Sequence, residues 1–224
     1  MAQSEKSTAP LPRMVSATVE GLNKSHPLLS DALSGLVEAY RALIGVFERG
    51  GILYLCGNGG SFADALHIKG ELAKSFVRPH PINDSGLVNA LNKSAGGKQL
   101  LKNLERALPV VVLGESHSLR SAYENDRDGR FAYAQELNAF VERIRPGALL
   151  GISTSGNSQN VMAAITLAKA YGLVTISFTG PDGGRMAQAA DIAWRAPGQT
   201  TADIQENQVP LYHALCKMIE AHFF

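Results

Sequence analysis

The chain has few cysteines and almost no imbalance of charge. Only two of its 224 residues are cysteines, which is too few for a disulfide framework, and Cys56 and Cys216 both fall in apolar segments typical of packed thiols. Lysine and arginine outnumber aspartate and glutamate by one, so the formal net charge is +1 and no basic face is available for a polyanion. We therefore expect no direct nucleic-acid partner.

The chain also lacks any apolar run of membrane-spanning length, which argues against a membrane partner. Its first residues, MAQSEKSTAPLPR, are polar and do not contain the apolar core of a secretory signal. With 224 residues and 45% hydrophobic content, the chain suits one domain with a buried core. We expect a soluble cytoplasmic protein with a flexible N-terminus over residues 1–14 and a single domain over 15–224.

Five short apolar runs alternate with helical patterns along the chain. The runs have the length of strands and lie at 52–56, 109–113, 148–153, 174–178 and 191–195. A long leading helix is expected over 28–51, and further helices at 62–76, about 86–107, 129–144, 160–171, 183–190 and 203–223. This alternation predicts an α/β fold, a single-domain three-layer α/β/α sandwich around a five-stranded parallel sheet.

Two loops that follow predicted strands have the composition of a binding site. CGNGGS, residues 56–61, has three glycines that let the backbone approach a ligand, although a tight strand-to-helix turn would also use them. The second loop carries four hydroxyl groups before a helix, at Ser153, Thr154, Ser155 and Ser158. A helix N-cap explains one hydroxyl but not four. A lysine-free cradle of this kind favours the phosphate of a small molecule such as a sugar phosphate.

One helix places ionisable side chains on a single face. His67 and Glu71 are four residues apart and share that face with Asp64 and Lys74. The opposite face is apolar and is expected to pack on the sheet. By spacing alone, an ordinary solvent-exposed face is the more common interpretation of such a stripe.

The motifs CGNGGS, His67-x-x-x-Glu71, ISTSGNS and Gln205-Glu206…His213 resemble the sugar isomerase (SIS) domain family, in its branch of sedoheptulose 7-phosphate isomerases. The similarity is close over 51–76 and 147–224 and loose elsewhere. It implies a flavodoxin-like fold, a homotetramer with active sites between subunits, and a zinc ion. The implied reaction is an aldose-ketose isomerisation of sedoheptulose 7-phosphate to D-glycero-D-manno-heptose 7-phosphate, or of a close sugar phosphate, through an enediolate in heptose biosynthesis.

The resemblance also implies roles for individual residues. Glu71 and His213 are the expected catalytic acid/base pair, and His67, Glu71, Gln205 and His213 the expected zinc ligands. The expected substrate-binding residues are Asn58, Gly59, Gly60, Ser61, Ser153, Thr154, Ser155, Ser158, Gln205 and Glu115. Gln205 and His213 lie eight residues apart on one helix, about 80° around its axis and about 12 Å along it. They share an ion only if the helix bends, and Pro210 offers either a bend or a late helix start.

The sequence departs from the family pattern at three places. An insertion occupies about 77–108 and is long enough for an extra helix near the site, which leaves another sugar phosphate open as the substrate. An acidic sugar-contacting residue of the family aligns only loosely with Glu115 or Asp126. The family's Gln-Glu-x-x-His pattern reads QENQV here, so a histidine is replaced.

A second class of function also fits the resemblance. A non-catalytic SIS protein would bind a sugar phosphate or a protein partner, like the relative that associates with the bacterial replication initiator. Such a protein would be indifferent to the loss of Glu71 or His213, which distinguishes it from an enzyme.

Overall fold

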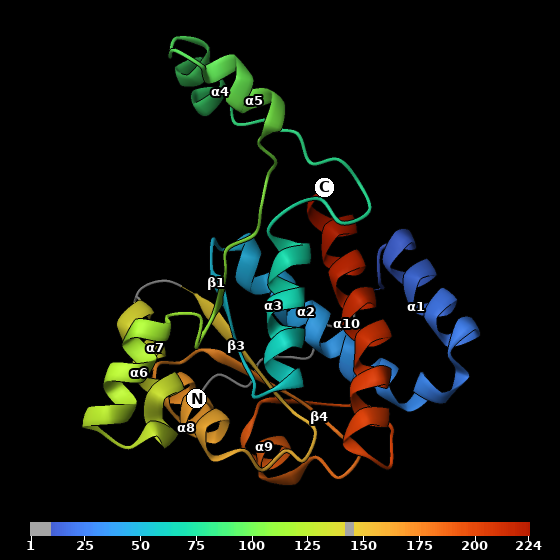
Figure 1. Ribbon diagram of the computed structural model, residues 1–224. Helices are drawn as coiled ribbons and strands as arrows, with labels where there is room; N and C mark the ends of the chain where they lie inside the picture. Colours follow the sequence, from blue (N-terminus) through green and yellow to red (C-terminus); the bar gives the residue numbers. More distant parts are fainter. Residues whose placement is uncertain (1–9, 142–145) are drawn as a thin grey trace.

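The computed structural model describes residues 10–141 and 146–224 and has a five-stranded sheet at its centre (Figure 1). The strands are β1 (Ile52–Cys56), β2 (Val110–Val112), β3 (Gly147–Ser153), β4 (Val174–Thr179) and β5 (Ile192–Arg195). All neighbours are parallel in the order β2-β1-β3-β4-β5, with Leu53 of β1 opposite Val110 and Ala148. This is the flavodoxin-like order, so the predicted sheet is confirmed.

Helices cover both faces of the sheet and complete the predicted three-layer sandwich. On one face lie α2 (Leu33–Glu48) and α3 (Gly60–Leu72), with α10 (Thr201–Phe223) packed across them and α1 (Arg13–Ser25) packed on α10. On the other lie α7 (Ala132–Phe140), α8 (Gln159–Ala170) and α9 (Gly184–Ala189). Alternate strand residues point to the two cores, as Leu55 and Cys56 of β1 do.

Two helices were missing from the sequence prediction. Helix α1 begins at Arg13, inside the stretch expected to be flexible, whereas residues 1–9 of that stretch lie outside the described part. Only Val15 and Leu22 of α1 are buried, so its apolar stripe was too narrow to recognise. Helix α6 (His117–Asp126) has no buried residue and therefore no apolar period. The leading helix expected over 28–51 is a 3₁₀ turn, Pro27–Ala32, followed by α2.

Other predicted boundaries need smaller corrections. The helix expected over 129–144 is a 3₁₀ turn, Gly129–Phe131, followed by α7, and its last part, 142–145, lies outside the described residues. The last helix is continuous from Thr201 and includes Pro210, so a late start is wrong. A capping box fixes its start: the Thr200 hydroxyl accepts from the Asp203 N–H, and the Asp203 carboxylate accepts from the Thr200 N–H.

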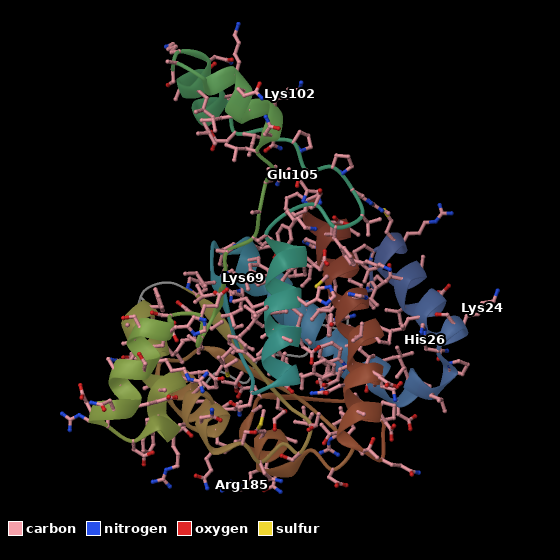
Figure 2. The ribbon with its side chains drawn as sticks, viewed as in Figure 1. Lys24, His26, Lys69, Lys102, Glu105 and Arg185 are labelled. Atoms are coloured by element: carbon pink, nitrogen blue, oxygen red, sulfur yellow. The ribbon has the colours of Figure 1, made fainter. Side chains whose placement is uncertain are left out.

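The insertion forms a hairpin of two short helices, α4 (Ser85–Asn92) and α5 (Gly97–Asn103), which projects away from the sandwich (Figure 1). One helix over 86–107 was expected, but the chain turns at Gly96, whose φ is +76°. Gly97 lies so close to Leu91 that a Cβ there would sit 1.7 Å from its carbonyl oxygen. In Figure 2, Lys102 lies on this hairpin and Glu105 near its root.

Removing the hairpin should leave the stability of the sandwich unchanged. No residue of α4 is buried, and in α5 only Gly97 is, so the hairpin buries almost none of its own apolar surface. A variant with residues 85–103 replaced by a short Gly-Ser linker is expected to melt at the temperature of the full chain, as measured by circular dichroism. A large drop in melting temperature would show that the hairpin supports the fold.

Both cysteines are buried and free, as predicted. Burial raises the pKa of the Cys56 thiol to about 12, which keeps it protonated. In the described part of the chain, no helix has the length and apolar content needed to cross a membrane.

Candidate active site

The two predicted loops meet where the strand order reverses, between β1 and β3. Asn58 follows β1 and Asn160 lies in the first turn of α8, and their side-chain amides exchange hydrogen bonds of 2.9 and 2.8 Å. The Tyr133 hydroxyl of α7 donates to the Gly57 carbonyl and lies 3.2 Å from the Asn58 side-chain oxygen. Neither Asn160 nor Tyr133 was identified from sequence, because no motif links them to these loops.

The glycines of the first loop are required by space and backbone angle. Gly59 has φ +55°, a region that favours glycine. A Cβ on Gly60 would lie 2.3 Å from the Gln205 amide nitrogen, so the present position of the Gln205 side chain requires glycine there. Ser61 is buried in the first turn of α3. The side chain of Gln205, which belongs to α10, therefore lies against the first loop.

The second loop holds its hydroxyls at the start of α8. Ser153 ends β3, is buried, and places its Oγ 2.9 Å from the Oγ of Ser158. Ser158 is the residue before α8, yet its side chain makes no capping hydrogen bond. Ser155 is exposed, and its hydroxyl accepts from the Asn157 N–H. Thr154 is half-buried between them. The N-cap interpretation therefore explains none of the four hydroxyls.

A cluster of three ionisable residues forms between α3 and α10. His67 and Glu71, one turn apart on α3, bring Nε2 and Oε1 to 3.1 Å. His213 of α10 places its Nε2 3.3 Å from the His67 Nε2. One donor atom from each residue lies within 4.8 Å of the others. Two imidazole nitrogens and a carboxylate oxygen at this separation match the donors that zinc prefers.

The predicted sidedness of α3 explains this cluster. Ala65, Ile68 and Leu72 are buried against the sheet, as expected from their spacing. The opposite stripe faces α10, since His67 Nε2 lies 3.3 Å from His213 Nε2. Lys74, just beyond the end of α3, places its Nζ 3.4 Å from a carboxylate oxygen of Glu71. What looked like an ordinary polar face is thus half of a site completed by another helix.

A tyrosine next to His213 completes a hydrogen-bonded chain behind the cluster. The Tyr212 hydroxyl lies 3.0 Å from His67 Nδ1 and donates to Asp64 Oδ1 at 3.4 Å. Burial, followed by the charge of Asp64, raises the pKa of Tyr212 well above its ordinary value, so the phenol stays protonated. Burial also raises the pKa of Asp64. Tyr212 was not predicted, because a buried aromatic residue on a helix reads as core.

His213 has the electrostatic surroundings of a neutral imidazole. Burial, followed by the neighbouring His67, lowers the pKa of His213, and Glu71 only partly opposes this. A neutral imidazole can accept a proton or bind a metal ion. On its other side, His213 lines a groove of about 610 Å³ between α1 and α10, together with His26 and Lys217.

The loosely aligned acidic residues lie on separate elements. Glu115 follows β2 and forms an ion pair with Lys69 of α3. Asp126 ends α6 and accepts a hydrogen bond from Asn125. Glu115 thus contacts the helix that carries His67 and Glu71. The contact of Asp126 is within its own helix.

Solved structures share this fold. The sugar isomerase domain of an RpiR transcription factor from Sphaerobacter thermophilus superimposes with a TM-score of 0.51 at 15% identity, and covers 94% of this chain and 89% of that one. A phosphoheptose isomerase from Francisella tularensis gives a TM-score of 0.71 at 24% identity, over 92% of this chain and 96% of that one. At these identities the likeness shows the fold alone, so the chain has the fold of a sugar isomerase domain.

Sequence relatives narrow the class to one family, although no family model matches the chain. Phosphoheptose isomerase of Helicobacter pylori (strain P12) is 33% identical over 205 residues, 91% of each chain. That of Leptospira biflexa is 32% identical over 197 residues, 88% of each chain. The structure of phosphoheptose isomerase GmhA from Neisseria gonorrhoeae has a TM-score of 0.67 at 28% identity, and covers 92% of this chain and 94% of that one. The chain belongs to the phosphoheptose isomerase family.

Proposed function

We propose that this chain isomerises sedoheptulose 7-phosphate to D-glycero-D-manno-heptose 7-phosphate through an enediolate. The relatives' name supports this substrate. The observation that carries the proposal is the cluster of His67, Glu71 and His213, which puts a carboxylate and two imidazoles within hydrogen-bond reach. Moving a proton between adjacent carbons of a sugar needs such an acid and base.

The reaction shifts one proton between carbons and loses no atoms. The Glu71 carboxylate takes the proton from the carbon beside the ketone and returns it to the neighbouring carbon. His213, held neutral by its surroundings, exchanges the proton between the two oxygens, so that the ketone becomes a hydroxyl and the former hydroxyl an aldehyde. The hydroxyl loop after β3 anchors the phosphate, and Asn58 and Ser61 contact sugar hydroxyls. Anchoring favours binding, whereas the placement of Glu71 favours rate.

The same cluster is suited to zinc. His67, Glu71 and His213 would hold the ion, with Gln205 of α10, whose side chain lies beside Gly60, as a further oxygen donor. When bound, zinc would polarise the sugar carbonyl and stabilise the developing negative charge. Equilibrium dialysis followed by elemental analysis is expected to find one zinc per chain.

We further propose a homotetramer with sites between subunits, in the cytoplasm. The single chain leaves His67 exposed and Leu66 on the same helix uncovered, which supports a neighbouring subunit beside the site. Two free, buried thiols suit a reducing compartment. Light scattering should give a mass four times the 23.9 kDa of one chain.

The direct test is to incubate the purified protein with sedoheptulose 7-phosphate and follow aldose formation by NMR. We expect net conversion of ketose to aldose. Unchanged ketose, with the wild type indistinguishable from an inactive variant, would reject the proposal. Within the SIS class a non-catalytic binding role is not favoured, because the curated relatives are named isomerases.

Removing the paired hydroxyls of the second loop should weaken substrate binding. Each hydrogen bond to a charged group contributes about 1.5–3 kcal/mol, so Ser153→Ala with Ser158→Ala, which removes two of them, should raise KM by at least about 100-fold with a smaller change in kcat. Thr166→Ala is the matched control, since this hydroxyl lies further along α8 and bonds only to the Met162 carbonyl. An unchanged KM in the double variant would place the phosphate elsewhere.

A further inference from the structure

One face of α7 carries two buried polar side chains that the proposed reaction does not use. Tyr133 and Glu136 are three residues apart, so they share that face, and they are 2% and 4% exposed. The Tyr133 hydroxyl donates to the Gly57 carbonyl, in the loop after β1. The Glu136 carboxylate accepts from the backbone N–H groups of Gly114 and Ser116, in the loop after β2. A single turn of α7 therefore holds both loops.

The loop after β2 is packed tightly between two layers of the sandwich. Gly114 has φ +103°, and a Cβ there would lie 2.9 Å from the Tyr133 ring and 3.2 Å from the Phe62 ring of α3. The next residue, Glu115, pairs its carboxylate with Lys69 of α3. The loop thus contacts α7 on one face of the sheet and α3 on the other. A shift of the loop would therefore move the Glu115 carboxylate relative to α3.

Glu136 and the loop after β2 satisfy each other's hydrogen-bonding needs. A buried carboxylate is costly unless it is hydrogen-bonded, and in its ionised form it can only accept. The N–H of buried Gly114 needs an acceptor for the same reason. Hydrogen bonds to a charged acceptor are about twice as strong as neutral ones. The carboxylate of Glu136 therefore fixes the backbone on both sides of Glu115.

We propose that Tyr133 and Glu136 are positioning residues, which hold the loops after β1 and β2 at the spacing that lets Asn58 and Glu115 contact the same sugar. The roles of Asn58 and Glu115 in binding the sugar rest on the proposed function, whereas the two loop contacts do not. Tyr133 and Glu136 act through the loops, because their own side chains are buried.

A double-mutant cycle tests whether Glu136 acts through Glu115. Glu136→Gln keeps the shape of the side chain and removes the charge that strengthens its hydrogen bonds. It should raise KM for sedoheptulose 7-phosphate by about 10-fold, with a smaller change in kcat. In a Glu115→Ala background the same substitution should raise KM by less than about 2-fold. An equal rise in both backgrounds, or none in either, would overturn the inference.

Glu220→Gln is the matched control for Glu136→Gln. Glu220 is also 4% exposed and also accepts backbone N–H groups, but from residues 76–78, which follow α3. Both variants should have a lower melting temperature than the wild type, whereas only Glu136→Gln should raise KM. A KM that rises equally in both would mean a general loosening of the fold and would contradict positioning by Glu136.

The hydroxyl of Tyr133 is tested in the same way against Asn58. Tyr133→Phe, which removes only the hydroxyl, should raise KM in the wild-type background and not in an Asn58→Ala background. Tyr40→Phe is the matched control, because the Tyr40 ring is also buried but its hydroxyl lies 3.1 Å from Nδ1 of His222, between α2 and α10. It should keep the wild-type KM. A Tyr133→Phe protein with the same KM as Tyr40→Phe would exclude Tyr133 as a positioning residue.

The contact of Glu136 with the loop can be measured without substrate. In ¹H–¹⁵N correlation spectra near neutral pH, the amide protons of Gly114 and Ser116 should move upfield in Glu136→Gln, because charge-assisted hydrogen bonds are the shorter ones. Unmoved resonances would overturn the inference. If these resonances move but the wild type converts no sedoheptulose 7-phosphate, the proposed function fails and the contact of Glu136 with the loop stands.

Discussion

Replacing Glu71 with glutamine is expected to reduce kcat for aldose formation by about 10²- to 10⁴-fold, the usual contribution of a positioned acid or base. Glutamine has nearly the shape of glutamate but cannot accept a proton at neutral pH. Glu71 is the carboxylate of the His67, Glu71 and His213 cluster, so no neighbouring carboxylate in that cluster replaces it. The rate is measured from the appearance of heptose 7-phosphate under saturating sedoheptulose 7-phosphate.

A control carboxylate shows whether the loss is specific. Glu124 on α6 is exposed and pairs with Arg120. Glu124→Gln should keep the wild-type rate, and both variants should have the wild-type circular dichroism spectrum. A Glu71→Gln protein that turns over normally would exclude Glu71 as the base, even if the wild type is active.

The sheet could be predicted because its central strands are buried on both faces. Every residue of β3 is buried, and such strands appear in the sequence as uninterrupted apolar runs. Helices that pack only through a narrow stripe or not at all give no such signal. Helix α1 buries two residues and α6 none, and both were missed.

The site was predictable where its residues are neighbours in sequence. His67 and Glu71 are one turn apart, and the hydroxyls of the second loop lie within six residues. Contacts between distant elements were not predictable from spacing. The distance from His213 to His67 depends on how α10 packs across α3, and the resemblance alone indicated it. Tyr212 and Asn160 gained their roles only from such packing.

We expect the largest effect on stability at the root of the insertion, the segment 75–80 that joins α3 to the hairpin. Glu220 of α10 is 4% exposed, and its carboxylate accepts hydrogen bonds from the backbone N–H groups of Phe76, Val77 and Arg78. The Nε2 of buried His80 lies 2.8 Å from the same carboxylate. Glu220→Ala leaves these donors without an acceptor. Leaving a buried donor unsatisfied costs about 1–3 kcal/mol, so with the backbone donors of Phe76, Val77 and Arg78 involved we expect a loss of at least about 3 kcal/mol in urea unfolding.

The stability that Glu220 contributes should decrease as the pH falls. Burial raises its pKa, but the backbone donors of Val77, Phe76 and Arg78 outweigh burial and hold the pKa below the ordinary value of 4.5. The stability from ionised Glu220 is therefore complete above that value and is lost as the pH falls through the lower folded-state pKa. The difference between wild type and Glu220→Ala should be constant near neutrality and shrink in acid.

A second carboxylate at the same root allows the effect of burial on stability to be distinguished from the effect of the number of hydrogen bonds. Glu105 also accepts from the chain that follows α3, through the N–H and hydroxyl of Ser75 at 2.8 Å each, but it is exposed to water. Water can replace Glu105 as the partner of Ser75, whereas it cannot easily reach the donors around Glu220. Glu105→Ala should thus be far milder. Equal losses in the two variants would mean that the number of hydrogen bonds, and not their burial, sets the strength of this root.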